Sequence, residues 1–161
     1  MNAPLPSIAA VRCMLKEHGV LLPSDHVRVD TYGESETLSN ELISLIRSGH
    51  KRAGTGLLWQ HEHVNEPVAQ VGEIKVVVNY AGIPSVVTRT VSTEVVAFNE
   101  VTAQYAATEG EGDGSLQHWR RAHWAYFSRE CERIGRTPNE SMLVVCSVFE
   151  VLHVLPEHPA A

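Results

Sequence analysis

The run "MLVVCSVFEVLHVL", residues 142–155, constrains the fold more than any other segment of the chain. Apolar side chains occupy both of its alternating faces, which is typical of a strand buried in the centre of a sheet. Three earlier runs also have β character: "GTGLLWQH" (54–61), "GEIKVVVNY" (72–80) and "PSVVTRTVSTEVVAF" (84–98). The last two are joined by "YAGI", where Gly82 can supply a turn. These runs predict a sheet with residues 142–155 in its interior.

Helical patterns lie before and between the predicted strands. Apolar residues three and four apart predict helices around residues 8–15, from Glu36 to Ser48, and from 115 to Gly135. A shorter helix is expected in "FNEVTAQYAATEG" (98–110). Because helices and strands do not alternate as regular βαβ units, we expect the α+β class, with a small curled sheet or barrel flanked by helices.

Length and composition restrict the class of protein. The chain of 161 residues fits one domain, and no apolar run approaches the roughly 20 residues of a membrane span. Arg12 and Lys16 interrupt the N-terminal apolar run, which makes a signal peptide a poor interpretation. Three widely spaced cysteines without a CxxC pair indicate reduced thiols and a cytoplasmic location. The net charge of −6 argues against non-specific nucleic-acid binding, so phosphate binding would require a local patch.

Lys51 lies in "LIRSGHKRAGTGLLW" (45–59), at the junction between a predicted helix and a predicted strand. Gly49 can end the helix, and Gly54 and Gly56 allow the backbone to approach a ligand closely. Residues 57–59 are expected to continue the strand. One interpretation is a ligand-binding cation, and the other is an ordinary surface charge in a turn. As a residue expected to pack little, Lys51 should be replaceable by alanine without loss of the fold.

The loop "EGEGDG" (109–114) offers three carboxylates separated by glycines. Glu109, Glu111 and Asp113 can provide oxygen ligands for Mg²⁺ or Mn²⁺, or a general base. The alternative is a solvated acidic turn in which Asp113 caps the next helix. Ser115 follows in the first turn of that helix, where a hydroxyl group can hydrogen-bond a phosphate.

Side chains on the long helix separate into two groups by position. Trp119 and Phe127 are predicted core residues, whereas Arg120 and His123 are candidates for a ligand cleft. His61 and His63 form an HxH pair at a predicted strand end, which a chain with nine histidines can contain by chance.

Three separated pieces carry a resemblance to a known family. "SGHKRAGTGLLW" resembles the G-x-K-x-x-T signature in its longer form KRATASLLW, and "EGEGDGSLQHWRRAHWAYF" resembles an EGEGD-SL-x-YWR-x-xH segment. "LVVCSVFEVLHV" resembles the final strand of the same family. Together with "TYGESETLSNEL", these pieces resemble the ASCH domain family, in its bacterial long form within the PUA-like superfamily.

The resemblance implies a PUA-like β-barrel flanked by helices and a cleft for RNA or nucleotides. We expect residues 1–30 to form an N-terminal helix and connector of the same globule. Residues 31–155 would form the ASCH domain, and residues 156–161 a C-terminal tail.

Two activities follow from the resemblance. Some ASCH proteins cleave single-stranded RNA with a divalent metal, and a shorter group hydrolyses the amide of 4-acetylcytidine with a lysine, a threonine and a glutamate. The lysine corresponds to Lys51 and the glutamate to Glu109, but the threonine position falls on Gly54. Thr55 comes one residue later, and we expect it to need a bulge or loop to reach the same site.

We therefore expect an RNA-directed hydrolase, with a metal-assisted ribonuclease ranked ahead of a 4-acetylcytidine amidohydrolase. The alternative is a non-catalytic RNA or nucleotide reader. The expected partners are single-stranded RNA or a modified nucleoside, with no membrane and no organic cofactor.

The expected catalytic residues are Lys51, Glu109, Thr55 and Ser115. The expected RNA contacts are His50, Arg52, Arg120, His123 and Trp59, and the expected Mn²⁺ or Mg²⁺ ligands are Glu111 and Asp113. Positive charge is expected to line one cleft, from Arg47, His50, Lys51, Arg52, Arg120 and Arg121.

Overall fold

The structure is a computed structural model that describes residues 4–157, so most of the predicted C-terminal tail lies outside the described residues. Helices and strands of this part follow one another in an irregular α+β order, which confirms the predicted class. They are α1 (Ile8–Glu17), β1 (Val27–Asp30), α2 (Glu36–Arg47), β2 (Ala53–Leu57), α3 (Leu58–His63), β3 (Ile74–Val78), β4 (Pro84–Ala97), the 3-10 helix η1 (Phe98–Glu100), α4 (Ala103–Glu109), α5 (Leu116–Ile134) and β5 (Leu143–Val154).

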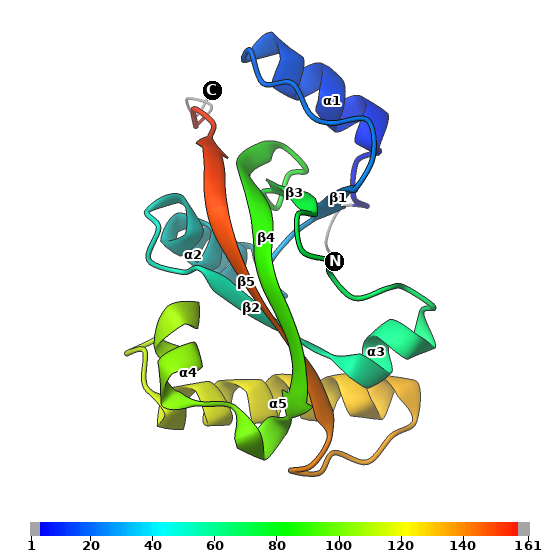
Figure 1. Cartoon of the computed structure of the whole chain (residues 1–161), viewed down its shortest axis with the longest axis vertical. Coiled ribbons are helices and arrows are strands. Elements are labelled where there is room, and N and C mark those ends of the chain that lie inside the picture. The colour runs from blue at the N-terminus through cyan, green and yellow to red at the C-terminus, as the bar shows by residue number, and fades with distance from the viewer. Residues whose placement is uncertain (1–3, 158–161) are drawn as a thin grey trace.

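One mixed sheet with the strand order β1-β3-β4-β5-β2 forms the centre of the molecule (Figure 1). β1 is parallel to β3, and the other neighbouring pairs are antiparallel. β5 lies between β4 and β2, as predicted for its apolar sequence. Two register shifts interrupt the β4–β5 pairing, after Val87 and after Thr90. Such irregularities increase the local bending of a strand.

The expected closed barrel does not form in the described part of the chain, because β1 and β2 remain at opposite edges of the sheet. The chain between these two strands forms α2 instead. Ile43 and Ile46 of α2 pack against sheet residues Val77, Val86 and Phe149. Helix α2 therefore buries apolar side chains of the sheet that would otherwise be buried inside a closed barrel.

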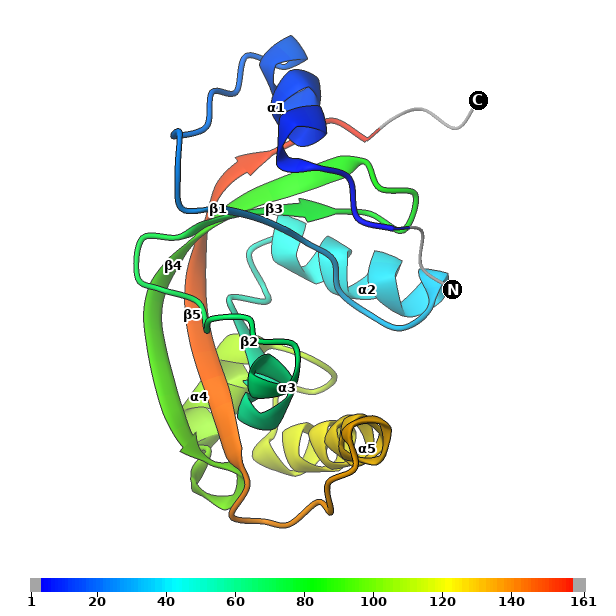
Figure 2. The same ribbon diagram turned by 90° about the vertical axis from the view of Figure 1, so that its right-hand side faces the viewer.

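Helices cover both faces of the curled sheet. Figure 2 shows α2, α3 and α5 on one side of β4 and β5, with α1 at the other end of the molecule. α1 buries Val11 and Leu15 against Val76 and Val87. A second core lies under α5, where Trp119 and Phe127 pack as predicted; its other buried members are Leu57, Phe98, Val101, Ala106, Cys131, Met142, Val144 and Cys146. Among the helices of residues 4–157, none has the length and apolar character that crossing a membrane requires.

The sequence predicted most elements correctly. α2 begins at the expected cap, where Ser35 Oγ accepts a hydrogen bond from Leu38 N, and Gly49 has the left-handed φ of 79°. β3 and β4 form the expected hairpin around Gly82. β1 was not predicted. It is a strand of four residues at the edge of the sheet, where it pairs with only one neighbouring strand.

The region after β2 differs from its prediction. Leu58 and Trp59 do not extend the strand but begin helix α3, which also carries His61 and His63. The physical reason is the lack of a partner. Leu57 already pairs with Val144, and β5 begins at Leu143. Beyond this point helix α3 satisfies the backbone hydrogen bonds internally.

Candidate functional site

The junction between α2 and β2 packs against the end of α4 and is hydrogen-bonded to it. Arg52 N donates a hydrogen bond to Thr108 O at 3.0 Å. Gly110, in the left-handed conformation after α4, approaches so closely that a Cβ atom there would lie 2.5 Å from His50 O. Only glycine permits this approach. The contact places Lys51 next to the last residue of α4, Glu109.

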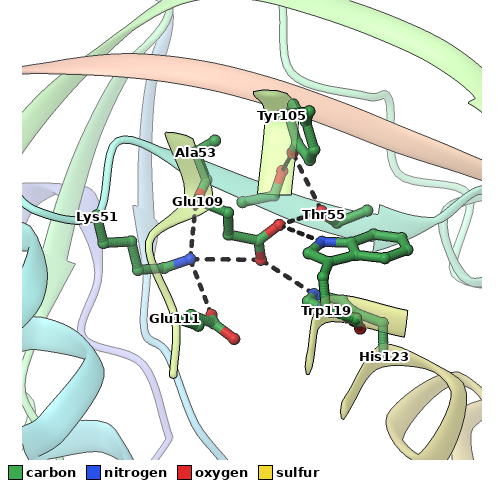
Figure 3. Close-up of polar contacts among 9 residues, drawn as sticks. Lys51, Ala53, Thr55, Tyr105, Glu109, Glu111, Trp119 and His123 are labelled. Carbon is green, nitrogen blue, oxygen red and sulfur yellow. Dashed lines mark hydrogen bonds and ion pairs between the residues drawn. The ribbon is translucent and has the colours of Figure 1, made fainter. Parts of the chain in front are cut away.

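Lys51 is a buried cation, although it was expected to pack little at the surface. Only 1% of the residue is exposed. Its ammonium donates to Ala53 O at 2.6 Å and lies 2.9 Å from Glu111 Oε1 and 3.5 Å from Glu109 Oε1 (Figure 3). Burial alone would lower the pKa of Lys51, but the two glutamates outweigh it and raise the pKa above its ordinary value. The ammonium therefore stays charged.

Glu109 is the centre of the polar network. Burial would raise the pKa of its carboxyl group, but hydrogen bonding from His123 and the charge of Lys51 outweigh this effect and lower the pKa to about 2. Oε1 contacts Lys51 and His123 Nε2, the latter at 3.0 Å. Oε2 accepts hydrogen bonds from Thr55 Oγ1 and Trp119 Nε1, both at 2.7 Å. Glu109 is thus an ionised group whose two oxygens are both fully engaged.

Thr55 reaches the network without a bulge. β2 pairs with β5 in an unbroken register, with Thr55 opposite Cys146. Because side chains alternate along a strand, Thr55 lies on the same side as Lys51 and Ala53, while Gly54 lies on the other side. Thr55 comes one residue later than the threonine of the motif, and we expected this shift to turn its side chain away from the site. In the structure Thr55 is instead within hydrogen-bonding distance of Glu109.

His123 and Trp119 extend the network into α5. Their rings stack with centroids 4.3 Å apart, and His123 Nδ1 lies 2.9 Å from Trp119 O. Burial would lower the pKa of His123, but its hydrogen bond with Glu109 and the carboxylate charges raise it. His123 is buried, so its contact is with Glu109 rather than with an open cleft surface.

Two predicted site residues lie just outside the network. Ser115 is the N-cap of α5, and its Oγ accepts a hydrogen bond from His118 N at 3.0 Å. Asp113 is exposed, and its Oδ1 accepts a hydrogen bond from Ser115 N at 2.9 Å. Ser115, and not Asp113 as the alternative interpretation had it, is therefore the cap of α5, and Asp113 binds the backbone of that cap from the loop.

Arg47 does not join the positive charge that was expected around Lys51. Arg47 points elsewhere and donates to Ser85 O and Leu155 O. Trp59 packs beside the core under α5, with the Arg136 guanidinium 4.9 Å from its ring. Of the six expected cations, Lys51 alone has a contact with Glu109 or Glu111 in residues 4–157. The remaining four are exposed: His50, Arg52, Arg120 and Arg121.

Glu109, Glu111 and His123 together could hold a metal ion. One ligand atom of each lies within 4.8 Å of the others. Two carboxylates and an imidazole are suitable ligands for Mn²⁺. Asp113 is not part of this group. The Lys51 ammonium already contacts both carboxylates, so a metal ion and Lys51 would compete for the same negative charge.

Sequence reasoning missed two contributors to the site. Tyr105 contacts Thr55 Oγ1 at 3.1 Å and donates to Gly54 O at 2.8 Å. Its position four residues before Glu109 on a predicted helix was a usable signal, because such residues share a face. Tyr32, whose ring centroid lies 5.6 Å from Lys51 Nζ, gave no comparable signal.

Comparisons with known proteins identify the family of the chain. The family model described as the ASCH domain matches residues 28–153. The chain is 37% identical to the ASCH domain from Lactobacillus crispatus, over 78% of this chain and 79% of that one, with a TM-score of 0.74. A protein from Enterococcus faecalis shares the fold at 24% identity, over 92% of this chain and 91% of that one, with a TM-score of 0.77. No curated protein matches the chain. The chain belongs to the ASCH domain family.

Proposed function

We propose that the protein is an RNA-directed hydrolase that cleaves single-stranded RNA and that Lys51 is part of its active site. The observation that carries this proposal is a charged ammonium buried beside two carboxylates, one of which is partly exposed to solvent. The side chain of Glu111 is 21% exposed, whereas that of Lys51 is 1% exposed. A phosphate oxygen that replaces Glu111 would meet a preorganised positive charge in a region of little water.

The network favours a distinct role for each charged group. Lys51 cannot accept a proton while its pKa is raised, so it stabilises the negative charge that develops on the phosphate. Glu109 is a poor base with a pKa of about 2, and it holds Lys51, His123 and Thr55 in place. Glu111, once a phosphate has replaced it beside Lys51, is the accessible carboxylate and accepts a proton from the water that attacks phosphorus. The bond from phosphorus to the leaving ribose oxygen breaks, and that oxygen takes a proton from solvent.

A divalent metal would stabilise the phosphate by an alternative arrangement, because it would compete with Lys51 for Glu109 and Glu111 and would make Glu111 a ligand instead of a base. Glu109, Glu111 and His123 would hold Mn²⁺ or Mg²⁺. When bound, such an ion supplies further stabilisation of negative charge on the phosphate.

The test is incubation of the purified protein with end-labelled single-stranded RNA, in Mn²⁺ and then in chelator. We expect cleavage by the wild-type protein and none by Lys51→Met, which is uncharged and close to lysine in length. Equal cleavage by both proteins would place the activity elsewhere or identify a contaminating ribonuclease. Binding of RNA without cleavage would support the non-catalytic reader instead.

The hydrogen bond from Thr55 to Glu109 favours one second candidate, hydrolysis of the amide of 4-acetylcytidine. A hydroxyl group beside a carboxylate and an ammonium is a suitable arrangement for a nucleophile. Turnover of the free nucleoside by the wild-type protein and its loss in Thr55→Val would support this activity. Absence of turnover in the wild-type protein would exclude it.

A further inference from the structure

We infer that a groove between α2 and the β3–β4 hairpin binds a small organic phosphate through Arg47. This inference goes beyond the proposed function, because none of the residues that line the groove belongs to the network around Glu109. The groove has a volume of about 360 Å³, which lies within the usual range for small-molecule sites. Figure 2 shows the hairpin above α2, with the chain after β5 at the same end of the molecule.

The protein fixes one edge of the Arg47 guanidinium. Arg47 is the last residue of α2, and its side chain is 18% exposed. Its Nη1 donates to Ser85 O at 2.9 Å, to Ser85 Oγ at 3.2 Å and to Leu155 O at 2.7 Å. These hydrogen bonds hold the guanidinium in one orientation. Binding an anion therefore does not require the ordering of a flexible side chain, which normally weakens binding.

The other edge of the guanidinium is available to a ligand. Neither Nε nor Nη2 donates a hydrogen bond to any of residues 4–157, and Nε lies 3.7 Å from Glu157 Oε1, beyond hydrogen-bonding distance. The Glu157 side chain is 81% exposed, so this ion pair contributes little and an anion can replace it at small cost. Nε and Nη2 together form the fork that binds two oxygens of a carboxylate or a phosphate.

Neutral donors on the walls favour phosphate over carboxylate. Asn79 Oδ1 accepts hydrogen bonds from Ala81 N and Ile83 N, both at 3.0 Å, which orients the amide and leaves Nδ2 as the free donor. Asn40 and Ser44 of α2 also line the groove, and their side chains make no hydrogen bond within residues 4–157. A carboxylate would use both of its oxygens on the arginine fork, whereas a phosphate group has a further oxygen for these donors.

The rest of the lining indicates a small molecule and not a nucleic-acid strand. Apolar side chains of Ile83, Pro84 and Pro156 provide a surface for a carbon skeleton beside the phosphate. Arg47 is the only lysine or arginine among the residues that line the groove in the described part of the chain. A nucleic-acid backbone requires several cations along its path, but one phosphate group requires only one such fork.

The test follows the Arg47 Nε–H and Asn79 Nδ2–H₂ signals by ¹⁵N NMR while ribose 5-phosphate, inorganic phosphate or acetate is added. We expect ribose 5-phosphate to shift both signals along one saturation curve, and to bind more tightly than inorganic phosphate and acetate. Acetate that binds as tightly as ribose 5-phosphate, or shifts that do not saturate, would overturn the inference.

Three variants test the groove itself. Arg47→Lys keeps the charge but removes the fork, and it should lower the affinity for ribose 5-phosphate about tenfold or more, as expected for one hydrogen bond to a charged group. Ser44→Leu fills the groove from an exposed helix position and should abolish binding even if Arg47→Lys fails to fold. Glu157→Gln removes the competing carboxylate and should raise the affinity by up to about fivefold.

Thr37→Leu is the matched control for Ser44→Leu, because Thr37 is exposed on the same helix and does not line the groove. It should bind ribose 5-phosphate as the wild type does, and unchanged binding in Ser44→Leu would overturn the inference. Single-stranded RNA that shifts the Arg47 signal at lower concentration than ribose 5-phosphate would overturn it too, by assigning the groove to RNA. RNA cleavage should be the same in Ser44→Leu as in the wild type, so the groove and the proposed hydrolase can fail separately.

Discussion

Two lysines lie near the ring of Tyr32, and their surroundings differ. Lys51 Nζ is 5.6 Å and Lys75 Nζ 5.8 Å from the ring centroid. The Lys75 side chain is 18% exposed and pairs with one carboxylate, Asp30, at 3.3 Å. The Lys51 side chain is 1% exposed and lies against two carboxylates from a distant segment. The pKa of each ammonium is raised, that of Lys75 chiefly by Tyr32 and that of Lys51 by the glutamates against the effect of burial.

The difference separates a structural ion pair from a candidate reactive centre. Asp30 and Lys75 lie on the paired strands β1 and β3, so sheet formation alone brings them together. Lys51 meets Glu109 across 58 residues of chain, and its second partner, Glu111, is set in a glycine-rich loop. A raised lysine pKa is common to both sites. What distinguishes the candidate reactive centre is the burial of its ammonium together with a partly exposed partner, Glu111.

The largest expected effect is on RNA cleavage. Lys51→Met should lower the single-turnover rate by about 10²–10³-fold, the usual loss when one preorganised charge is removed. Lys75→Met should stay within about twofold of the wild type, because a partly exposed pair contributes little. Comparable losses in both variants would show that the two lysines act through the overall charge and not through a site.

Stability should separate the two lysines next. Lys51→Met leaves Glu109 buried with less compensation, and removing one partner of a buried pair costs about 3–5 kcal/mol. Lys75→Met should cost about 0–1 kcal/mol. Urea unfolding measures both values. This prediction reverses the expectation from sequence that Lys51 can be replaced at little cost.

The acid dependence of stability tests Glu109 directly. Its folded-state pKa of about 2 lies below the unfolded value of 4.5, so its contribution is present above pH 4.5 and is lost as the pH falls toward 2. Glu109→Gln should flatten the decline of the unfolding free energy in this window. An unchanged slope would show that Glu109 is not held ionised by its partners.

His123 contributes with the opposite sign. Its pKa is raised in the folded state, so its stabilisation is complete below its ordinary pKa of 6.5 and is lost as the pH rises through the raised value. His123→Gln should therefore lose more stability at pH 6 than at pH 9. An equal loss at both pH values would mean that the ring is neutral beside Glu109.

A smaller effect than that of Lys51→Met is expected for Thr55→Val, which removes one hydrogen bond to a carboxylate that keeps its other donors. We expect a loss of about 1.5–3 kcal/mol in unfolding free energy, as for other hydrogen bonds to charged groups. RNA cleavage should change only a few fold, since Thr55 does not contact Lys51 Nζ through any described hydrogen bond. A large loss of cleavage would assign Thr55 to the reaction.

The sequence predicted the elements of this fold better than their assembly. The apolar run of β5 and the cap and glycine of α2 each depend on local preferences, and they appear where expected. The open sheet could not be predicted, because closure depends on how α2 packs against Val77 and Phe149. Burial of Lys51 was missed for a similar reason. A lysine is normally exposed, and its carboxylate partners come into contact only after α4 is fastened to the junction before β2.

The prediction that Thr55 needs a bulge to reach the site was wrong for a different reason. Lys51, Ala53 and Thr55 follow the alternation of an ordinary strand, so the regular pattern already placed Thr55 beside Lys51. Matching the chain to the family signature placed the threonine position at Gly54, and Thr55 was therefore expected on the opposite face. Which carboxylates were accessible could not be read from "EGEGDG", since nothing in these letters indicates that Glu109 is buried, Glu111 half-buried and Asp113 exposed.

The comparison of the two lysines can be tested most directly by observing their ammonium groups. In protein labelled with ¹⁵N at lysine Nζ, single-stranded RNA is added while the Lys51 and Lys75 resonances are followed by NMR, with Lys51→Met and Lys75→Met providing the assignments. We predict that the Lys51 resonance shifts as a phosphate replaces Glu111, and that the Lys75 resonance stays in place. A shift of Lys75 alone, or RNA binding that leaves Lys51 unchanged, would contradict the account.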